Sequence, residues 1–321
     1  MKVFNEEEIR DHIGLTKEAI AEVENGFNRL QAGDTEMPPI MRIDVRDYNG
    51  EVDVKSAYVR GEEIFAVKLS SGFFDNYKLG LPSGNGLMVL INSQTGVPEA
   101  VLLDNGYLTD VRTAAAGAIT AKYLAPEKVK TAGVIGAGTQ ARFQMKALKQ
   151  FRDFERILVY APSNRRIDEF VAEMKEALGI EVEAVDSAEK VVRESEAVVT
   201  TTPAKEPVIQ ADWLHPGLHI TAMGSDAEEK NELDAQVLAK ADRLVCDVKS
   251  QCFRLGELHH GLEQGVITHD SEITELGEIT SGKAKGRADP EQITVCDLTG
   301  TGVQDTAIAG YTLRKLTNEE R

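Results

Sequence analysis

The stretch VKTAGVIGAGTQARFQMKAL, residues 129–148, decides the fold of this chain. An apolar segment leads into a glycine-rich turn, and the residues after the turn have the spacing of an amphipathic helix. Gly136, Gly138 and Ala141 form the pattern G-x-G-x-x-A. Backbone N–H groups at such a turn can hold a pyrophosphate, although the same pattern can also form a tight strand–helix turn without a ligand.

The residues that follow this turn alternate between strand-like and helix-like segments. The strand candidates are AGVIG, RILVYA, EVEAV, AVVTTT, HITAM, RLVCDV and ITVCDL. This alternation predicts an α/β fold with a doubly wound parallel sheet and right-handed crossovers, which favours dinucleotide binding at the turn. We expect a Rossmann-type domain over residues 126–305.

The residues before this domain predict a second architecture. Residues 1–30 carry apolar side chains at helical spacing and predict one amphipathic helix. Residues 40–103 contain short β-like segments separated by glycine-bearing turns, and residues 108–126 predict a helix that ends at Pro126.

The end of the chain predicts one further helix. The residues after Asp305 are too few for a domain of their own, so we expect them to pack on the N-terminal region. The first domain would then be a discontinuous α+β domain of residues 1–125 and 306–321.

Composition and charge limit the class of protein. The chain has 321 residues, of which 42% are hydrophobic, and these values are typical of a two-domain globular protein. It has no apolar leader and no apolar run of about 18 residues, so we expect a cytoplasmic location and no membrane partner. The net charge of -17 disfavours nucleic acid as a partner. We expect Cys246, Cys252 and Cys296 to be buried, reduced thiols, and we expect no metal site.

The end of the second strand of the Rossmann-type domain bears on the choice of cofactor. An acidic residue there accepts the ribose hydroxyls of NAD and repels the 2′-phosphate of NADP. No acid stands at Tyr160 or Ala161, which would tolerate NADP. The polar residues that follow are Ser163, Asn164, Arg165 and Arg166.

Three cations lie within predicted strands or at a helix start. They are Arg42, Lys68 and Arg112, and together they could bind the carboxylate of an amino or imino acid. Each one alone could equally be a surface or salt-bridged cation.

Two segments after predicted strands complete the candidate site. Asp226 follows a strand whose end should lie at the carboxyl edge of the sheet, where it could exchange a proton with a substrate nitrogen. Alternatively, Asp226 caps a helix. Residues 297–309 form a second glycine-rich loop, which could border the cofactor or act as a hinge between the domains.

The chain resembles the ornithine cyclodeaminase/mu-crystallin family along nearly its whole length. The segments that carry this resemblance, in the same order as in the family, are LTDVRTAAAGAITAKYLA, GVIGAGTQARFQ, GSDAEEKNELD, CDVKSQCFRLGEL and DLTGTGVQDTAIA. The resemblance implies a homodimer. It also implies that the N-terminal domain, completed by the last helix, binds substrate and forms the dimer contact.

The resemblance also implies roles for individual residues. Arg42, Lys68 and Arg112 match the family's ligands for the substrate carboxylate, and Asp226 matches its acid/base residue. We count Lys68 with Asp226 as catalytic. The expected cofactor contacts are Thr113, Gly136, Gly138, Thr139, Gln140, Ala141, Ser163, Arg165, Ser225 and Gly302.

Two departures from the family pattern concern the substrate. The chain reads DAEEK where members commonly have GK after the aspartate segment, and it reads VKSAY where many have an apolar segment. The second change adds Lys55 and Ser56, which would suit the second carboxylate of a dicarboxylic acid and would not suit the distal ammonium of ornithine. Alternatively, Lys55 faces solvent on a strand edge.

This pattern is similar to that of the iminosuccinate reductases and of cyclodeaminase-like proteins of ectoine use. We therefore expect NAD(P)H-dependent reduction of an α-imino acid, with iminosuccinate reduced to L-aspartate. NAD(H) is favoured as the cofactor, and NADP(H) stays open. The alternatives are an ornithine-type cyclodeaminase that releases ammonia and a mu-crystallin-like protein that binds NAD(P)H and a ligand without turnover.

Overall fold

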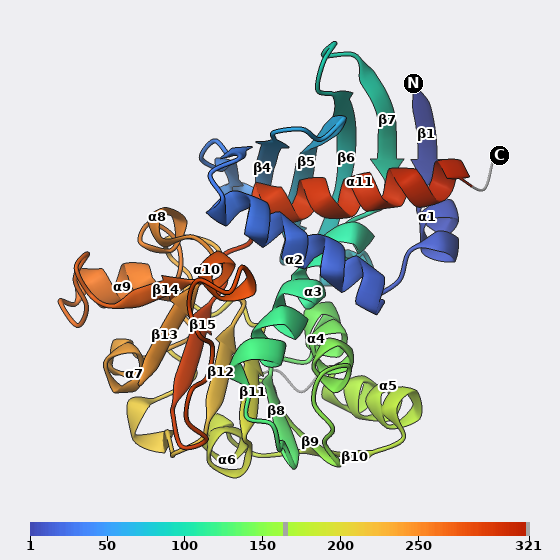
Figure 1. The fold of residues 1–321 in the computed structure, drawn as a ribbon. Coiled ribbons are helices and arrows are strands. Elements are labelled where there is room, and N and C mark those ends of the chain that lie inside the picture. The colour runs from blue at the N-terminus through green and yellow to red at the C-terminus, as the bar shows by residue number, and fades with distance from the viewer. Residues whose placement is uncertain (163–165, 319–321) are drawn as a thin grey trace. The chain divides into compact units, whose positions relative to one another are not determined.

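The computed structural model describes residues 1–162 and 166–318 and divides the chain into two compact units (Figure 1). The first unit is Met1–Ala115 with Thr301–Arg321, and the second is Ala116–Gly300. The boundaries thus lie at residues 115/116 and 300/301, where the sequence placed them at 125/126 and 305/306. Among the described residues, no helix has the length and hydropathy that a bilayer span requires.

The first unit contains a seven-stranded sheet. Its strand order is β1-β7-β6-β5-β4-β2, and β3 pairs with β4. β1 runs parallel to β7, and the other pairs are antiparallel. Its elements are β1 (Lys2–Asn5), α1 (Glu6–His12), α2 (Lys17–Gln31), β2 (Thr35–Glu36), β3 (Met41–Val45), β4 (Gly50–Val59), β5 (Ile64–Phe73), β6 (Gly84–Asn92), β7 (Pro98–Leu103), the first part of α3 (Tyr107–Leu124) and α11 (Gly302–Asn318).

The prediction of one helix over residues 1–30 was wrong. The chain begins with β1, and two separate helices follow it. Asn5 caps α1 in a capping box with Glu8, and α1 ends before Ile13. Thr16 then caps α2 through a bond from the N–H of Ala19. The helical spacing of apolar residues continues across this break, but α1 ends before Ile13 and α2 starts anew after the cap at Thr16.

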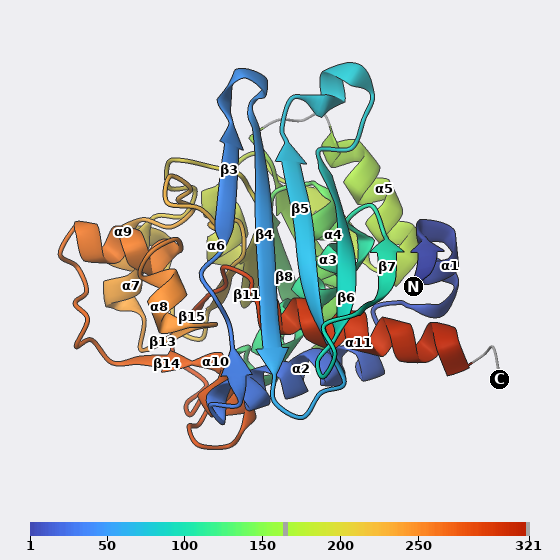
Figure 2. The same cartoon turned by 90° about the horizontal axis from the view of Figure 1, so that it is seen from above.

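The strand predictions between residues 40 and 103 were confirmed. In β4, alternate residues are buried, from Glu51 through Lys55 to Val59. This period of two gives the sheet an inner face and an outer face. Figure 2 looks onto the outer face, with α11 lying behind β5 and β6.

Helix α11 packs on the inner face of the sheet and against α2. The hydroxyl of Thr306 donates to the carbonyl of Ala57 in β4 at 2.7 Å and accepts from the N–H of Ala66 in β5 at 3.1 Å. Val303 packs against Ala57 and Val59. The helix begins at Gly302, so only residues 298–301 of the predicted 297–309 loop lie outside secondary structure.

The second unit is built on an eight-stranded, fully parallel sheet of order β10-β9-β8-β11-β12-β15-β13-β14. All seven predicted strands are present, and the three-residue β14 was not predicted. The bounds are β8 (Thr131–Ile135), α4 (Thr139–Lys149), β9 (Arg156–Tyr160), α5 (Ile167–Leu178), β10 (Glu181–Ala184), α6 (Ala188–Glu194), β11 (Ala197–Thr200), β12 (His219–Ala222), α7 (Ala235–Lys240), β13 (Arg243–Cys246), α8 (Lys249–Cys252), α9 (Glu257–Glu263), β14 (Ile273–Glu275), α10 (Leu276–Thr280) and β15 (Thr294–Asp297).

The central strands of this second sheet are buried on both faces, as is usual for parallel sheets. Every residue of β8, β11, β12 and β15 is buried. The three cysteines lie in or beside this core as free, buried thiols, as the sequence predicted.

Candidate active site

The glycine-rich turn between β8 and α4 has the geometry of a pyrophosphate cradle. Gly136 has a φ of +115°, and a Cβ at this position would lie 2.5 Å from Oγ1 of Thr201, so only glycine fits. A Cβ on Gly138 would meet nothing within 4 Å, and no side chain caps α4 at this residue. Open space beside uncapped N–H groups fits a nicotinamide dinucleotide, which the backbone N–H groups of residues 137–140 would hold, whereas the N–H of Gly136 donates to the carbonyl of Tyr160.

The other residues expected to contact the cofactor lie in several parts of the fold. Thr139 is exposed at the start of α4, and Gln140 follows it and accepts a bond from Gln144. Ala141 is buried beneath the turn. Thr113 is buried on α3 in the first unit. Ser163 and Arg165 lie outside the described residues.

Ser225 and Gly302 have structural tasks that the sequence did not reveal. The hydroxyl of Ser225 is buried and donates to the carbonyl of Lys230, which closes a turn. A Cβ on Gly302 would lie 2.2 Å from the carbonyl oxygen of Ser56, so this glycine allows α11 to approach β4. Both contacts account for these residues without a cofactor.

Asp226 lies in the loop that joins β12 to α7, at the carboxyl edge of the parallel sheet. Its carboxylate is 33% exposed and forms an ion pair with Nζ of Lys230 at 2.6 Å. The alternative in which Asp226 caps a helix was wrong, because Asp234 caps α7 through a bond from the N–H of Gln236. Lys230 was missed in the sequence, although its i+4 spacing from Asp226 was visible.

In the first unit, Lys68 and Arg112 share one buried carboxylate. Asp305, on α11, accepts a hydrogen bond from Nζ of Lys68 at 2.9 Å, and Nε of Arg112 lies 3.0 Å from the same oxygen. Arg112 is only 5% exposed. Within the described part of the chain, its terminal nitrogens have no hydrogen-bond partner, so the guanidinium fork is available for an anion.

Lys55 joins this cluster from β4. It pairs directly with Lys68 across the two antiparallel strands, so both side chains lie on the inner face of the sheet. Lys55 is 4% exposed, which excludes the alternative of a solvent-facing lysine on a strand edge. The pairing of Lys55 with Ser56 in one carboxylate site was wrong, because adjacent residues of a strand point to opposite faces.

Arg42 lies on the same inner face, opposite Asp53 in the β3–β4 pairing. Its Nη2 donates to Glu51 at 2.6 Å and its Nε donates to Asp44 at 2.8 Å. The guanidinium is therefore already engaged by two carboxylates of its own unit. The guanidinium of Arg42 is therefore less available for a substrate carboxylate than that of Arg112.

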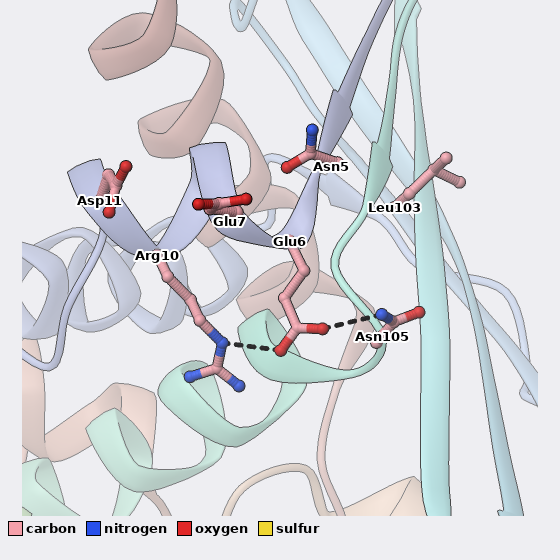
Figure 3. Close-up of a pocket in the computed structure, with 7 residues that line it drawn as sticks. All are labelled: Asn5, Glu6, Glu7, Arg10, Asp11, Leu103 and Asn105. Carbon is pink, nitrogen blue, oxygen red and sulfur yellow. Dashed lines mark hydrogen bonds and ion pairs between the residues drawn. The ribbon is translucent and has the colours of Figure 1, made fainter.

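A shallow surface hollow beside β1 and β7 is a less suitable site (Figure 3). The carboxylate of Glu6 accepts bonds from Arg10 and Asn105, each at 2.7 Å. These bonds, from Asn105 first and then Arg10, lower the pKa of Glu6. Glu6, Arg10 and Asn105 thus bond to one another and join α1 to the turn before α3.

Comparisons with known proteins identify the family. The model of the ornithine cyclodeaminase/mu-crystallin family matches residues 2–320. The chain belongs to this family, as its sequence pattern suggested. An uncharacterized cyclodeaminase of Sinorhizobium fredii is 49% identical over 322 residues, and the match covers 100% of this chain and 97% of that protein.

Three solved structures share the fold along their whole length, and each match covers 100% of this chain. A Thermococcus litoralis Δ1-pyrroline-2-carboxylate reductase in complex with NADH and L-proline has a TM-score of 0.95 at 33% identity, with 98% of that chain covered. An archaeal alanine dehydrogenase dimer with bound NAD has a TM-score of 0.92 at 33% identity, with 97% covered. The iminosuccinate reductase of Paracoccus denitrificans in complex with NAD+ has a TM-score of 0.89 at 30% identity, with 97% covered. The predicted α/β fold with a Rossmann-like domain is confirmed.

The buried position of Lys68 predicts a pH-dependent contribution to stability. Burial, followed by the charge of Arg112, lowers the pKa of Lys68 to about 7, while Asp305 opposes this shift and Lys55 adds to it. Between about pH 7 and 10.5 the unfolded chain therefore binds more protons than the folded one. This part of the free energy of unfolding should rise with pH by up to about 1.4 kcal/mol per unit.

Urea denaturation of the wild type and of Lys68→Met at pH 7, 8 and 9 measures this contribution. The free energy of unfolding of the wild type should increase relative to that of Lys68→Met as pH rises. The exposed Lys78→Met serves as the control, whose difference from the wild type should stay constant. A pH-independent difference for Lys68→Met would contradict the prediction.

Proposed function

We propose that this protein reduces an α-imino acid with a nicotinamide cofactor, and that its substrate is iminosuccinate, which gives L-aspartate. The enzyme is an NAD(P)-dependent oxidoreductase of the class that acts on CH–NH and C=N bonds. The observation that carries the proposal is the buried Arg112, whose terminal nitrogens have no hydrogen-bond partner among the described residues. Asp305 is one carboxylate shared by two buried cations, Lys68 and Arg112, so a further anion is favoured here, and a carboxylate is the anion that a guanidinium fork binds in two parallel bonds.

Lys55 supports a substrate with two carboxylates. In this proposal Arg112 and Lys68 bind the α-carboxylate and Lys55 binds the β-carboxylate, because Lys55 and Lys68 lie side by side on the inner face. Arg42 would contribute to the α-carboxylate only after exchanging its bonds to Glu51 and Asp44. Ser56 has no part in this assignment.

Asp226 acts as the acid/base group for the substrate nitrogen. A bound nicotinamide cofactor supplies the hydride for the C=N carbon, and Asp226 serves as the group that holds or gives the proton at nitrogen. Lys230 keeps the Asp226 carboxylate in place through the ion pair at 2.6 Å. Lys68 assists through its amine, whose pKa of about 7 lets it bind or release a proton near neutrality.

NAD(H) is the cofactor we assign. Relatives of this chain were solved with NADH, NAD or NAD+. β9 ends at Tyr160 without an acid to repel a 2′-phosphate, so we expect some activity with NADP(H) as well.

A second candidate function is cyclodeamination of a diamino acid. It is favoured by Glu51 and Asp53, two buried carboxylates on the inner face of β4 that would suit a distal ammonium. The name of the Sinorhizobium fredii relative points in the same direction. Binding of cofactor and ligand without turnover is the third possibility.

An assay of substrate and cofactor separates these functions. Oxaloacetate and pyruvate, each with ammonia, are tested for NADH and NADPH consumption at 340 nm, and ornithine is tested for ammonia release. The reductase consumes cofactor with oxaloacetate and ammonia, and with higher kcat/KM for NADH. Ammonia release from ornithine without net cofactor change would identify the cyclodeaminase, and inactivity in every assay would favour the binder.

The Lys55→Met variant extends this assay to the site. It should lose about 30- to 1,000-fold in kcat/KM with oxaloacetate and ammonia, because one charge-assisted contact worth roughly 2–4 kcal/mol is removed. Activity with pyruvate and ammonia should change little. Ser56→Ala is the matched control, since its side chain lies on the opposite face. An equal fall with both oxo acids, or no fall, would place Lys55 outside the β-carboxylate site.

The role of Asp226 predicts a loss of turnover without a loss of folding. Asp226→Asn should lower kcat by about 10²-fold while cofactor affinity and thermal stability stay near wild type. Asp234→Asn, at the cap of α7, should show the reverse pattern of lower stability with kcat retained. A kcat for Asp226→Asn within about threefold of wild type would reject the assignment.

The outer face of the first sheet supports a homodimer. Apolar residues of neighbouring strands gather on this face, and Met41 and Ile43 are 55% and 52% exposed. Met41 lies in register with Val54, Leu69 and Leu87, and Ile43 lies in register with Val52 on the same face. A contiguous exposed apolar face of this kind favours a protein contact, and an archaeal alanine dehydrogenase relative was solved as a dimer.

Sedimentation velocity tests this contact. The wild type should sediment as a dimer, and Leu69→Glu should shift it toward monomer because a charge would be buried in the contact. Val97→Glu, in the turn between β6 and β7, is the control and should leave the dimer intact. A monomeric wild type would disprove the homodimer.

A further inference from the structure

A fully buried carboxylate, that of Glu232, joins two strand ends at the carboxyl edge of the second sheet. One oxygen accepts from the backbone N–H and the hydroxyl of Thr202, at 2.6 and 2.8 Å. The other accepts from the hydroxyl of Thr200 and the N–H of Gly224, both at 2.7 Å. Thr200 ends β11 and Gly224 follows β12, so one side chain fixes both segments.

The loop after β12 is pressed closely onto this carboxylate. A Cβ on Gly224 would lie 2.1 Å from the carbonyl oxygen of Thr202 and 2.6 Å from the carboxyl carbon of Glu232. Burial raises the pKa of Glu232, whereas its bonds from Thr200, Thr202 and Gly224 oppose that shift. Both oxygens must accept, so an amide of the same shape would turn an NH2 group toward at least one donor.

Glu232 also closes the loop of residues 224–232 on itself. Its side chain holds the first residue of the loop, and its own N–H donates to Glu257 at 2.9 Å. Glu257 in turn accepts from Asn231 and Leu233, at 2.8 and 3.0 Å. Both ends of the loop are thus fixed by buried carboxylates, and Asp226 with its partner Lys230 lies between them.

We propose that Glu232 is the positioning residue for Asp226: it sets the place of the Asp226 carboxylate by closing the loop of residues 224–232. The proposal rests on the proton role of Asp226 in the proposed function. Glu232 is itself 0% exposed and has no access to substrate. Its effect on turnover therefore passes through Asp226.

A double-mutant cycle in the full-length protein tests this coupling. Glu232→Gln should lower kcat by about 10- to 100-fold, because a small displacement of a catalytic group has effects of that size. In the Asp226→Asn background the same change should lower kcat by no more than about threefold, since no positioned carboxylate is left to displace. Losses that multiply in the double variant, or full activity of Glu232→Gln, would overturn the proposal. If Asp226→Asn alone keeps its activity, the proposed function of Asp226 fails instead.

A second measurement needs no cofactor or substrate. Lys230 is a trypsin site inside the loop, and cleavage after it should be at least about tenfold faster in Glu232→Gln than in the wild type, because the loop opens locally. Glu196→Gln is the matched control. Glu196 also accepts two backbone N–H bonds, from Lys130 and Thr131, but at the opposite edge of the sheet. This control should lose stability while cleavage after Lys230 and kcat stay unchanged, and equal effects of both variants would reject a positioning role.

Thr200→Val covers the case in which Glu232→Gln does not fold. It removes one of the four donors to Glu232 and keeps the shape of the side chain. We expect a fall in kcat of about three- to tenfold that disappears in the Asp226→Asn background. A fall of equal size in both backgrounds would contradict the proposal.

Discussion

The first unit depends on one buried ion pair, that of Lys68 in β5 with Asp305 in α11. Burying either group without its hydrogen-bond partner is costly, so this contact favours one placement of α11 on the sheet. The same carboxylate oxygen also lies beside Arg112 of α3. One side chain thus arranges two cations from different elements, and their geometry is a property of the fold before any substrate arrives.

The second unit uses buried carboxylates in a similar way at its functional edge. Glu232 holds the segments after β11 and β12, and Asp247 accepts from the N–H groups of Thr299 and Gly300 after β15. These acids face inward and bond to backbone, which leaves the outward positions of the loops to residues such as Asp226. The loops are therefore held by buried carboxylates of the unit in addition to contacts within the loops, such as that of Asp226 with Lys230.

Local patterns predicted most of the fold, since strand alternation and the G-x-G-x-x-A turn can be read within a few residues. The caps at Asn5 and Thr16 were also local, but the continuous apolar spacing concealed them. The assignment of Ser56 to the same carboxylate site as Lys55 was wrong because successive residues of a strand point to opposite faces. Asp305 and Glu232 could not be found in this way, because their partners Lys68 and Thr200 lie 237 and 32 positions away in the chain.

The interrupted first unit has a consequence for synthesis on the ribosome. β4 and β5 emerge early, carrying Lys68 and the apolar residues that α11 covers, but α11 emerges only after the entire second unit. The nascent chain therefore holds an incomplete sheet, with Lys68 on its uncovered inner face, while residues 116–300 are translated and fold as an insertion. The first unit can therefore be completed only after residues 116–300 have been translated, and chaperones would meet the inner face of that sheet during the interval.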